Sequence, residues 1–210
     1  MKLYIIGAGG HAKVVLDAAL SQNREVGGFI DPGKAGQLFK GLPIFATIED
    51  LDGPQNFIVA IGDNRKRKNC FDDLLSHGWT PTTVIHAKAY VAKDANVGAG
   101  TVVCAGALIN PDASVGENSI VNTGSIIEHD CQVGAHVHVA PRATLSGNCI
   151  VGEGSLVGAA ATLLPGVHLS DWVVAGAGAV VTRHIGPNLT VVGVPARPLA
   201  VNLHRTATDE

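Results

Sequence analysis

The chain has 210 residues, of which 46% are hydrophobic and 4% aromatic, and its formal net charge is −3. This near-neutral balance argues against a nucleic-acid partner, and the lack of any apolar run of about 18 residues argues against a membrane span. The four cysteines have neither paired nor metal-ligand spacing, so we expect no metal site, reduced thiols and a cytoplasmic location.

Residues 1–80 alternate strand and helix patterns. Short apolar runs predict three strands, at residues 3–6, 26–30 and 57–61. Residues 11–20 have helical periodicity and follow the first run directly. Because strands that alternate with helices usually form parallel sheets, this pattern predicts a small Rossmann-like α/β domain of about three strands.

A glycine-rich turn joins the first predicted strand to the first helix. Gly7-x-Gly9-x-x-Ala12 matches the dinucleotide fingerprint, and Asp31 ends the second strand, where a ribose-binding acid is found. Bare backbone amides at a helix N-terminus favour a phosphate. Since three strands make only half a dinucleotide fold, a mononucleotide or a nucleotide sugar fits better than NAD. The alternative is a tight turn without a ligand.

Residues 81–198 repeat every six residues. From Ile85 to Val181 every sixth residue is aliphatic, with Ala175 the smallest, and the residue four places later is usually small. This period fits neither an α-helix nor an amphipathic strand, but it fits a left-handed parallel β-helix with three short faces per coil. We therefore predict the α/β domain, then a left-handed β-helix of hexapeptide repeats, then a frayed tail at residues 199–210.

The length of one coil, three repeats, predicts a pair of neighbouring residues. Gly147 lies three repeats after His129, so we expect it directly above or below the imidazole, with its N–H open to a ligand. A histidine can take a proton from a reacting group, and an open backbone amide can donate to an oxyanion. Asp130 would hold the imidazole tautomer if its side chain folds back.

Five motifs occur in order along the chain: Gly7-Ala-Gly-Gly-His11-Ala-Lys, Ala60-Ile-Gly-Asp-Asn64-x-x-Arg67, Asn122-Thr-Gly124, His129-Asp130-Cys131 and Gly193-Val-Pro-Ala-Arg197. Together they resemble the bacterial nucleotide-sugar N-acetyltransferases of the hexapeptide-repeat family, of the bacillosamine and perosamine type, which are related to sialic-acid O-acetyltransferases. The resemblance covers almost the whole chain. It implies acetyl-CoA-dependent N-acetylation of a UDP- or GDP-linked 4-amino-4,6-dideoxy sugar for glycan or O-antigen synthesis. It also implies a homotrimer with active sites at the subunit interfaces.

The resemblance implies roles for individual residues. His129 is expected to be the general base that takes the proton of the amine as it attacks the thioester, with Asp130 as its acidic partner, and the transfer is expected to be direct. The residues expected to contact acetyl-CoA are His138, Gly147, Gly158, Ala159 and Ala177. The residues expected to bind the nucleotide sugar are Gly9, Gly10, His11, Asp31 and Asn122.

Several of these residues have alternative interpretations. His138 could instead pack at a trimer interface, and Cys131 with Cys149 could be a nucleophile or metal pair, although stacked core packing explains them better. The basic run at residues 65–68 is expected to be a solvated helix face. The histidines expected on the surface are His86, His136, His168 and His184. For the whole protein, the alternatives are a sugar O-acetyltransferase and a non-catalytic nucleotide-binding scaffold.

Overall fold

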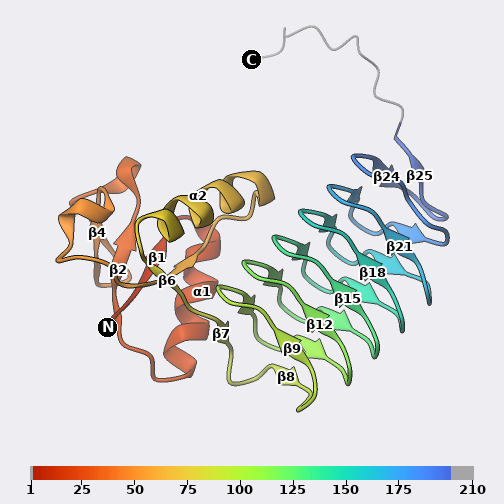
Figure 1. Cartoon of the computed structure of the whole chain (residues 1–210), viewed down its shortest axis with the longest axis horizontal. Coiled ribbons are helices and arrows are strands. Elements are labelled where there is room, and N and C mark those ends of the chain that lie inside the picture. Colours follow the sequence, from red (N-terminus) through yellow and green to blue (C-terminus); the bar gives the residue numbers. More distant parts are fainter. Residues whose placement is uncertain (1, 200–210) are drawn as a thin grey trace, which may run out of the picture.

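The computed structural model describes residues 2–199 and contains an α/β domain beside a long column of stacked coils (Figure 1). The front domain has a six-stranded sheet in the order β3-β4-β2-β1-β5-β6, parallel except for the β3–β4 hairpin. The strands are β1 (Leu3–Ile6), β2 (Val26–Ile30), β3 (Leu38–Phe39), β4 (Leu42–Phe45), β5 (Asn56–Val59) and β6 (Thr80–Pro81). The expectation of about three strands is therefore wrong. β3 and β6 have only two residues each and show no periodic pattern, and β4 contains Pro43, which argues against a strand.

Two helices of the front domain pack against the column. They are α1 (Gly10–Ser21) and α2 (Asn64–Ser76), and two 3-10 turns, η1 (Pro32–Lys34) and η2 (Ile48–Asp50), follow β2 and β4. Buried residues of α1 share one apolar cluster with outward side chains of the column, among them Val102 and Ile120. On α2, Phe71 is fully buried and its ring lies against the ring of His136 in the column. The two domains are thus packed through both helices.

The column has one two-residue strand in every six residues, from β7 to β23, and each strand ends on a predicted aliphatic position. The first face holds β7 (Val84–Ile85), β10 (Val102–Val103), β13 (Ile120–Val121), β16 (His138–Val139), β19 (Leu156–Val157), β22 (Val174–Ala175), β24 (Thr190–Val192) and β25 (Arg197–Pro198). The second holds β8 (Tyr90–Val91), β11 (Leu108–Ile109), β14 (Ile126–Ile127), β17 (Thr144–Leu145), β20 (Thr162–Leu163) and β23 (Val180–Val181). The third holds β9 (Asn96–Val97), β12 (Ser114–Val115), β15 (Gln132–Val133), β18 (Ile150–Val151) and β21 (His168–Leu169).

Parallel pairing between coils confirms the predicted hexapeptide β-helix. Val103 pairs with Val121 on the first face, and Ile127 pairs with Leu145 on the second, so equivalent residues are one coil apart. The aliphatic residues and the small residues beside them fill one continuous core. Cys131 and Cys149 belong to that core and are fully buried, which confirms their packing role.

The chain crosses from the front sheet to the column between β6 and β7. Residues 200–210, most of the expected tail, lie outside the described part of the chain. Within the described part, no helix combines the length and apolar character needed to cross a membrane. Residues 2–199 also contain no group of three or more His, Cys, Asp or Glu side chains placed to hold a metal ion.

Candidate functional site

The glycine loop leaves an open cavity at the start of α1. Gly7 has a φ of +94°, which favours glycine, and it turns the chain from β1 toward the helix. A Cβ atom added at Gly9 or Gly10 would meet nothing within 4 Å. A cavity of about 480 Å³ lies here, lined by the loop, Asp31 and residues 60–62. Because the N–H groups of the first helical turn are free to donate, this loop is suited to an anion.

Two side chains from the segment after β2 shape the same loop. The carboxylate of Asp31 accepts hydrogen bonds from Ala8 N at 2.9 Å and from Gly33 N at 3.1 Å. Asp31 therefore lines the cavity, but both of its oxygens accept hydrogen bonds from the backbone of this chain. Lys34 Nζ donates to the Ala8 carbonyl at 2.6 Å and brings a positive charge to the loop. Sequence reasoning missed Lys34, because no motif marks it.

His11, Asn122 and His138 lie where the two domains meet. The rings of His11, in the first turn of α1, and His138, on β16, have centroids 6.4 Å apart. Asn122 Nδ2 lies 3.0 Å from His138 Nε2, and since an amide nitrogen can only donate, Nε2 is the acceptor. Burial, with a smaller effect from Arg67, lowers the pKa of both histidines to about 4. Both are neutral near pH 7, and His11 Nε2 is buried without a partner among the described residues.

Arg67 is 1% exposed, so the expectation of a solvated face for residues 65–68 is wrong at this position. Its guanidinium donates to the carbonyls of Asn118 at 2.8 Å, His136 at 2.7 Å and Ile61 at 3.1 Å. The physical reason is the contact between α2 and the column: Arg67, Phe71 and Leu74 form the inward stripe of the helix. Burial lowers the pKa of Arg67 to about 10, so it stays charged near neutral pH.

Two histidines that were expected on the surface are buried as well. His136 is 3% exposed, and its Nδ1 lies 2.9 Å from Asn118 Nδ2. His86 is 8% exposed, and its Nδ1 accepts from Lys88 N at 2.9 Å. His136 lies in the turn before β16 and His86 follows β7, so both flank the first face. The front domain covers them, with Phe71 of α2 against His136 and Asp17 of α1 beside His86, and the repeat pattern alone does not reveal this cover.

His129 and Gly147 occupy one corner of the column, between the second and third faces. A Cβ atom on Gly147 would lie 2.6 Å from His129 Cε1, which confirms the predicted stacking. Within the described chain, the Gly147 N–H has no acceptor. His129 Nδ1 lies 2.7 Å from Asp130 Oδ2, because Asp130 has a φ of +60° that turns its side chain back. This hydrogen bond is the main cause that raises the pKa of His129.

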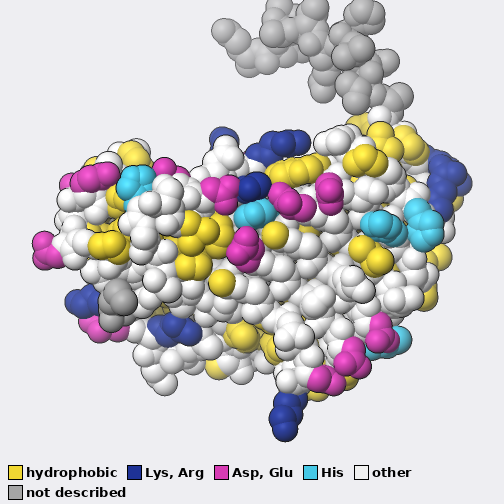
Figure 2. Space-filling model, viewed as in Figure 1, with side chains coloured by type: hydrophobic (Ala, Val, Ile, Leu, Met, Phe, Trp, Pro, Cys, Tyr) yellow, Lys and Arg dark blue, Asp and Glu magenta, His cyan; other side chains and the backbone are white. Residues whose placement is uncertain are grey.

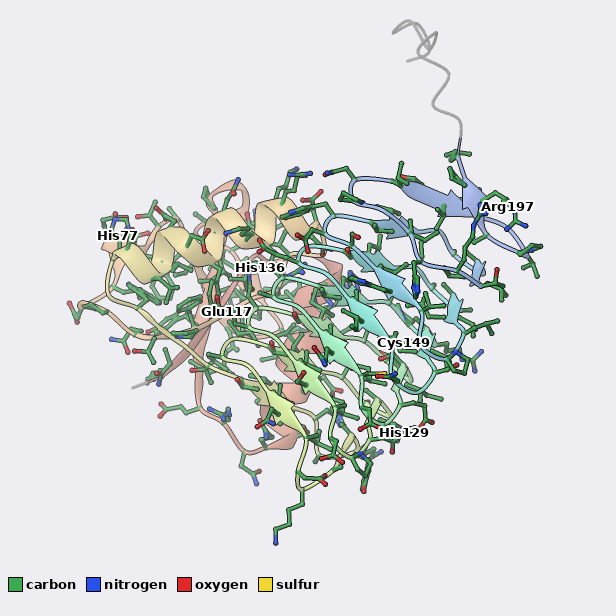
Figure 3. All side chains as sticks on the ribbon, turned by 45° about the vertical axis from the view of Figure 1, so that its right-hand side comes forward. His77, Glu117, His129, His136, Cys149 and Arg197 are labelled. Carbon is green, nitrogen blue, oxygen red and sulfur yellow. The ribbon has the colours of Figure 1, made fainter. Side chains whose placement is uncertain are left out.

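The predicted residues form two separate groups within one chain. His138 lies on the first face, and Asn122, Gly158, Ala159 and Ala177 follow strands of that face at its edge with the second face. His129, Asp130 and Gly147 lie at the next corner, and Figure 3 shows His129 at the edge of the column that is remote from the front domain. The chain therefore brings His129 to Gly147 but not to His138.

Two family models match this chain: the PglD N-terminal domain over residues 2–74, and the bacterial transferase hexapeptide (six repeats) over residues 112–147. PerB from Caulobacter crescentus, solved with CoA and GDP-perosamine, is 35% identical with a TM-score of 0.90, covering 95% of this chain and 97% of that chain. The acetyltransferase domain of PglB from Neisseria gonorrhoeae FA1090 is 36% identical with a TM-score of 0.90, covering 94% and 99%.

Among curated proteins, the GDP-perosamine N-acetyltransferase of Escherichia coli O157:H7 is 28% identical over 112 residues, which is 49% of this chain and 51% of that protein. This chain spans about half or less of the length of the curated relatives it matches.

Proposed function

We propose an activity for this chain from the premise that it belongs to the bacterial nucleotide-sugar N-acetyltransferases. The reaction is transfer of the acetyl group of acetyl-CoA to the 4-amino group of a nucleotide-linked 4-amino-4,6-dideoxy sugar. The observation that carries the proposal is the contact between His129 and Gly147, with Asp130 at 2.7 Å on the far side of the imidazole. A purely structural column needs neither the exposed imidazole nor the open amide beside it.

His129 acts as the general base in this proposal. Its Nδ1 is held by Asp130, so Nε2 is left to take the proton that the amine loses as its nitrogen bonds to the acetyl carbon. The Gly147 N–H donates to the acetyl oxygen as negative charge develops there. The carbon–sulfur bond then breaks, and the thiolate of CoA leaves. No acetyl group is transferred to the enzyme.

The remaining contacts divide between the two substrates. His138 and the edge formed by Gly158, Ala159 and Ala177 hold acetyl-CoA. Gly9, Gly10, His11 and Asn122 hold the nucleotide sugar, with Asp31 and Lys34 fixing the glycine loop. The backbone amides and the nearby Lys34 ammonium favour the diphosphate.

We propose a homotrimer with active sites between subunits. Support comes from the separation of the two groups: His129 and the edge beside His138 lie at different corners of one column. A second copy that packs its His129 corner against that edge would complete the site, and a closed threefold ring repeats the contact without leaving a free face. Acetyl-CoA and nucleotide sugars are cytoplasmic metabolites, so we place the enzyme there, in glycan or O-antigen synthesis.

The test is thiol release from acetyl-CoA with a panel of GDP-, UDP- and dTDP-linked 4-amino sugars, for the wild type and for His129→Ala. We expect turnover with one amino sugar and a loss of about a hundredfold in the variant. Acetylation of a hydroxyl acceptor alone would make the protein an O-acetyltransferase. No turnover with any acceptor would favour the scaffold.

A further inference from the structure

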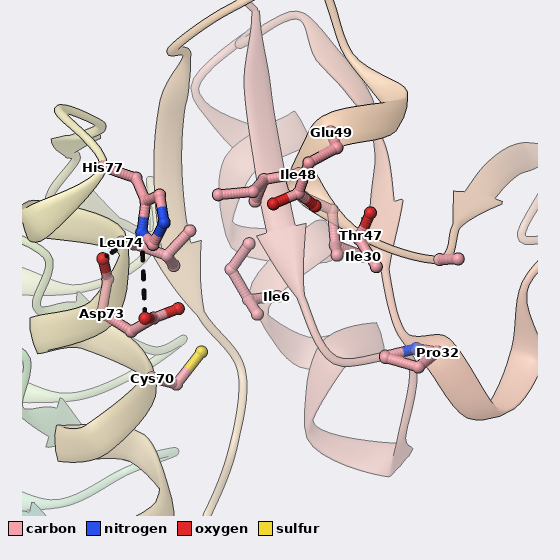
Figure 4. Close-up of a pocket in the computed structure, with 11 residues that line it drawn as sticks. Ile6, Ile30, Pro32, Thr47, Ile48, Glu49, Cys70, Asp73, Leu74 and His77 are labelled. Atoms are coloured by element: carbon pink, nitrogen blue, oxygen red, sulfur yellow. Dashed lines mark hydrogen bonds and ion pairs between the residues drawn. The ribbon is translucent and has the colours of Figure 1, made fainter.

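A second cavity adjoins the glycine loop (Figure 4). It has a volume of about 310 Å³, lies between η2 and α2, and shares Ile6, Ile30, Pro32 and Cys70 with the glycine-loop cavity. The two cavities therefore meet across the carboxyl ends of β1 and β2, where open α/β sheets bind ligands. A ligand with its phosphates at the glycine loop can extend into this second cavity.

The walls of the second cavity are apolar. Ile6 and Leu74 are 7% and 3% exposed, and Ile48 lies on the opposite side, on η2. Burial raises the pKa of the Cys70 thiol to about 11, so Cys70 is a neutral part of the wall. Aliphatic walls of this kind suit a flat heterocycle, and the volume lies within the usual range of ligand sites.

The rim of the cavity is acidic. Glu49 and Thr47 come from the η2 side, and Asp73 and His77 come from α2. A hydrogen bond from Thr47 is the main cause that lowers the pKa of Glu49, so its carboxylate is ionised near neutral pH. No Lys or Arg lines this cavity in the described chain, whereas Lys34 donates to the glycine loop next to it. The charges thus favour a phosphate in the glycine-loop cavity and a group with several hydrogen-bond donors in the second cavity.

We infer that the second cavity is the nucleobase subsite of the nucleotide-sugar substrate, and that Glu49 selects guanine. The inference rests on the proposed function. Guanine presents an N1–H and a 2-amino group side by side, and one carboxylate can accept from both. Uracil and thymine present a single N–H between two carbonyl oxygens, which a carboxylate repels. Hypoxanthine keeps the N1–H but lacks the 2-amino group, so it isolates the second hydrogen bond.

The experiment is isothermal titration of GDP, IDP and UDP into the full chain, without acetyl-CoA. We expect GDP to bind about tenfold tighter than IDP, and UDP to bind more weakly still. Glu49→Gln keeps one acceptor oxygen and should bring the affinity for GDP down to that for IDP. Glu49 is exposed, so the variant should fold. Glu25→Gln is the matched control, because Glu25 is exposed and, among residues 2–199, its one ion pair is with Lys2.

The outcomes separate the two proposals. Equal binding of GDP and UDP, or a Glu49→Gln variant that keeps the preference of the wild type, would overturn the guanine subsite and leave the acetyltransferase proposal standing. If none of the three diphosphates binds, the nucleotide-sugar substrate itself is wrong, and the subsite is wrong with it.

Discussion

Gly147 lies so close to His129 that an added Cβ would sit 2.7 Å from the imidazole Nε2, the nitrogen assigned as base. A Gly147→Ala substitution must therefore push the ring away from its position beside Asp130. Since both residues lie outside the core of the column, the fold should tolerate the change. We expect kcat to fall about tenfold or more, with an unchanged thermal midpoint.

Gly186→Ala is the control for this substitution, because a Cβ there would meet nothing within 4 Å. Steady-state acetyl transfer and a thermal unfolding scan on both variants check the prediction. A Gly147→Ala enzyme with the kcat of the wild type would show that the close contact has no part in catalysis.

The hydrogen bond between His129 and Asp130 predicts a shift in the pH profile. The neutral imidazole is the base, so kcat/KM should rise with pH through the His129 pKa, which Asp130 holds above its ordinary value of 6.5. Asp130→Asn removes the carboxylate and should move the rising limb to lower pH, while lowering the plateau because the imidazole is no longer oriented. The pH profiles of the two proteins decide the point, and an unmoved limb would exclude His129 as the titrating base.

Shared active sites predict complementation between inactive variants. His129→Ala and His138→Ala chains, each inactive alone, should recover activity when they are coexpressed. A site that takes His129 from one chain and His138 from the next is intact in about a quarter of cases after random assembly of equal amounts. Purification through two different tags removes the two kinds of homotrimer, and each remaining mixed trimer has one intact site out of three, so it should have about a third of the wild-type activity. Sites formed within single chains would give none.

The buried Arg67 predicts a strong effect on stability. Arg67→Met leaves the carbonyls of Asn118 and His136 without their donor, and we expect the free energy of unfolding to fall by about 3 kcal/mol. Arg65→Met is the control on the same helix. It removes a stacking contact with Trp172, whose ring centroid lies 4.2 Å from Arg65 Cζ, worth about 0.5–1 kcal/mol. Urea denaturation measures the free energy of unfolding of the two variants. Equal decreases would contradict the role of the Arg67 hydrogen bonds in holding α2 against the column.

The histidines between the domains predict acid sensitivity. Burial is the main cause that lowers the pKa of His11, His136 and His138 from 6.5 to about 4. Between those values the unfolded chain binds more protons than the folded chain, so stability falls as pH falls from about 6.5 toward 4. Each histidine adds a slope of up to about 1.4 kcal/mol per pH unit. Urea midpoints at pH 7, 6 and 5 measure this slope.

His136→Gln should reduce that slope, whereas the exposed His168→Gln serves as its control. A slope that is the same in the wild type and in His136→Gln would mean that His136 binds its proton in the folded protein as readily as in the unfolded chain.

The column could be predicted to the residue because its signal is local. Each aliphatic residue from Ile85 to Val181 turns inward for reasons contained in its own six-residue repeat, and the neighbours of Gly147 follow from counting one coil. The burial of Arg67, His86 and His136 depends instead on which face the front domain covers. Glu49 and Cys70 line one cavity although they come from separate elements, and neither carries a motif that would bring them together.

The repeated register of the column also limits which insertions and deletions this enzyme family can accept during evolution. Equivalent residues on one edge, such as Ala159 and Ala177, are separated by whole coils, each about 4.8 Å high. A ligand that lies along the edge is therefore contacted at fixed intervals. The edge can be lengthened or shortened only by complete coils, since a shorter insertion that joins the repeat itself would turn aliphatic residues out of the core. Fine adjustment of substrate choice is left to the front domain, whose short strands and turns are free of that constraint.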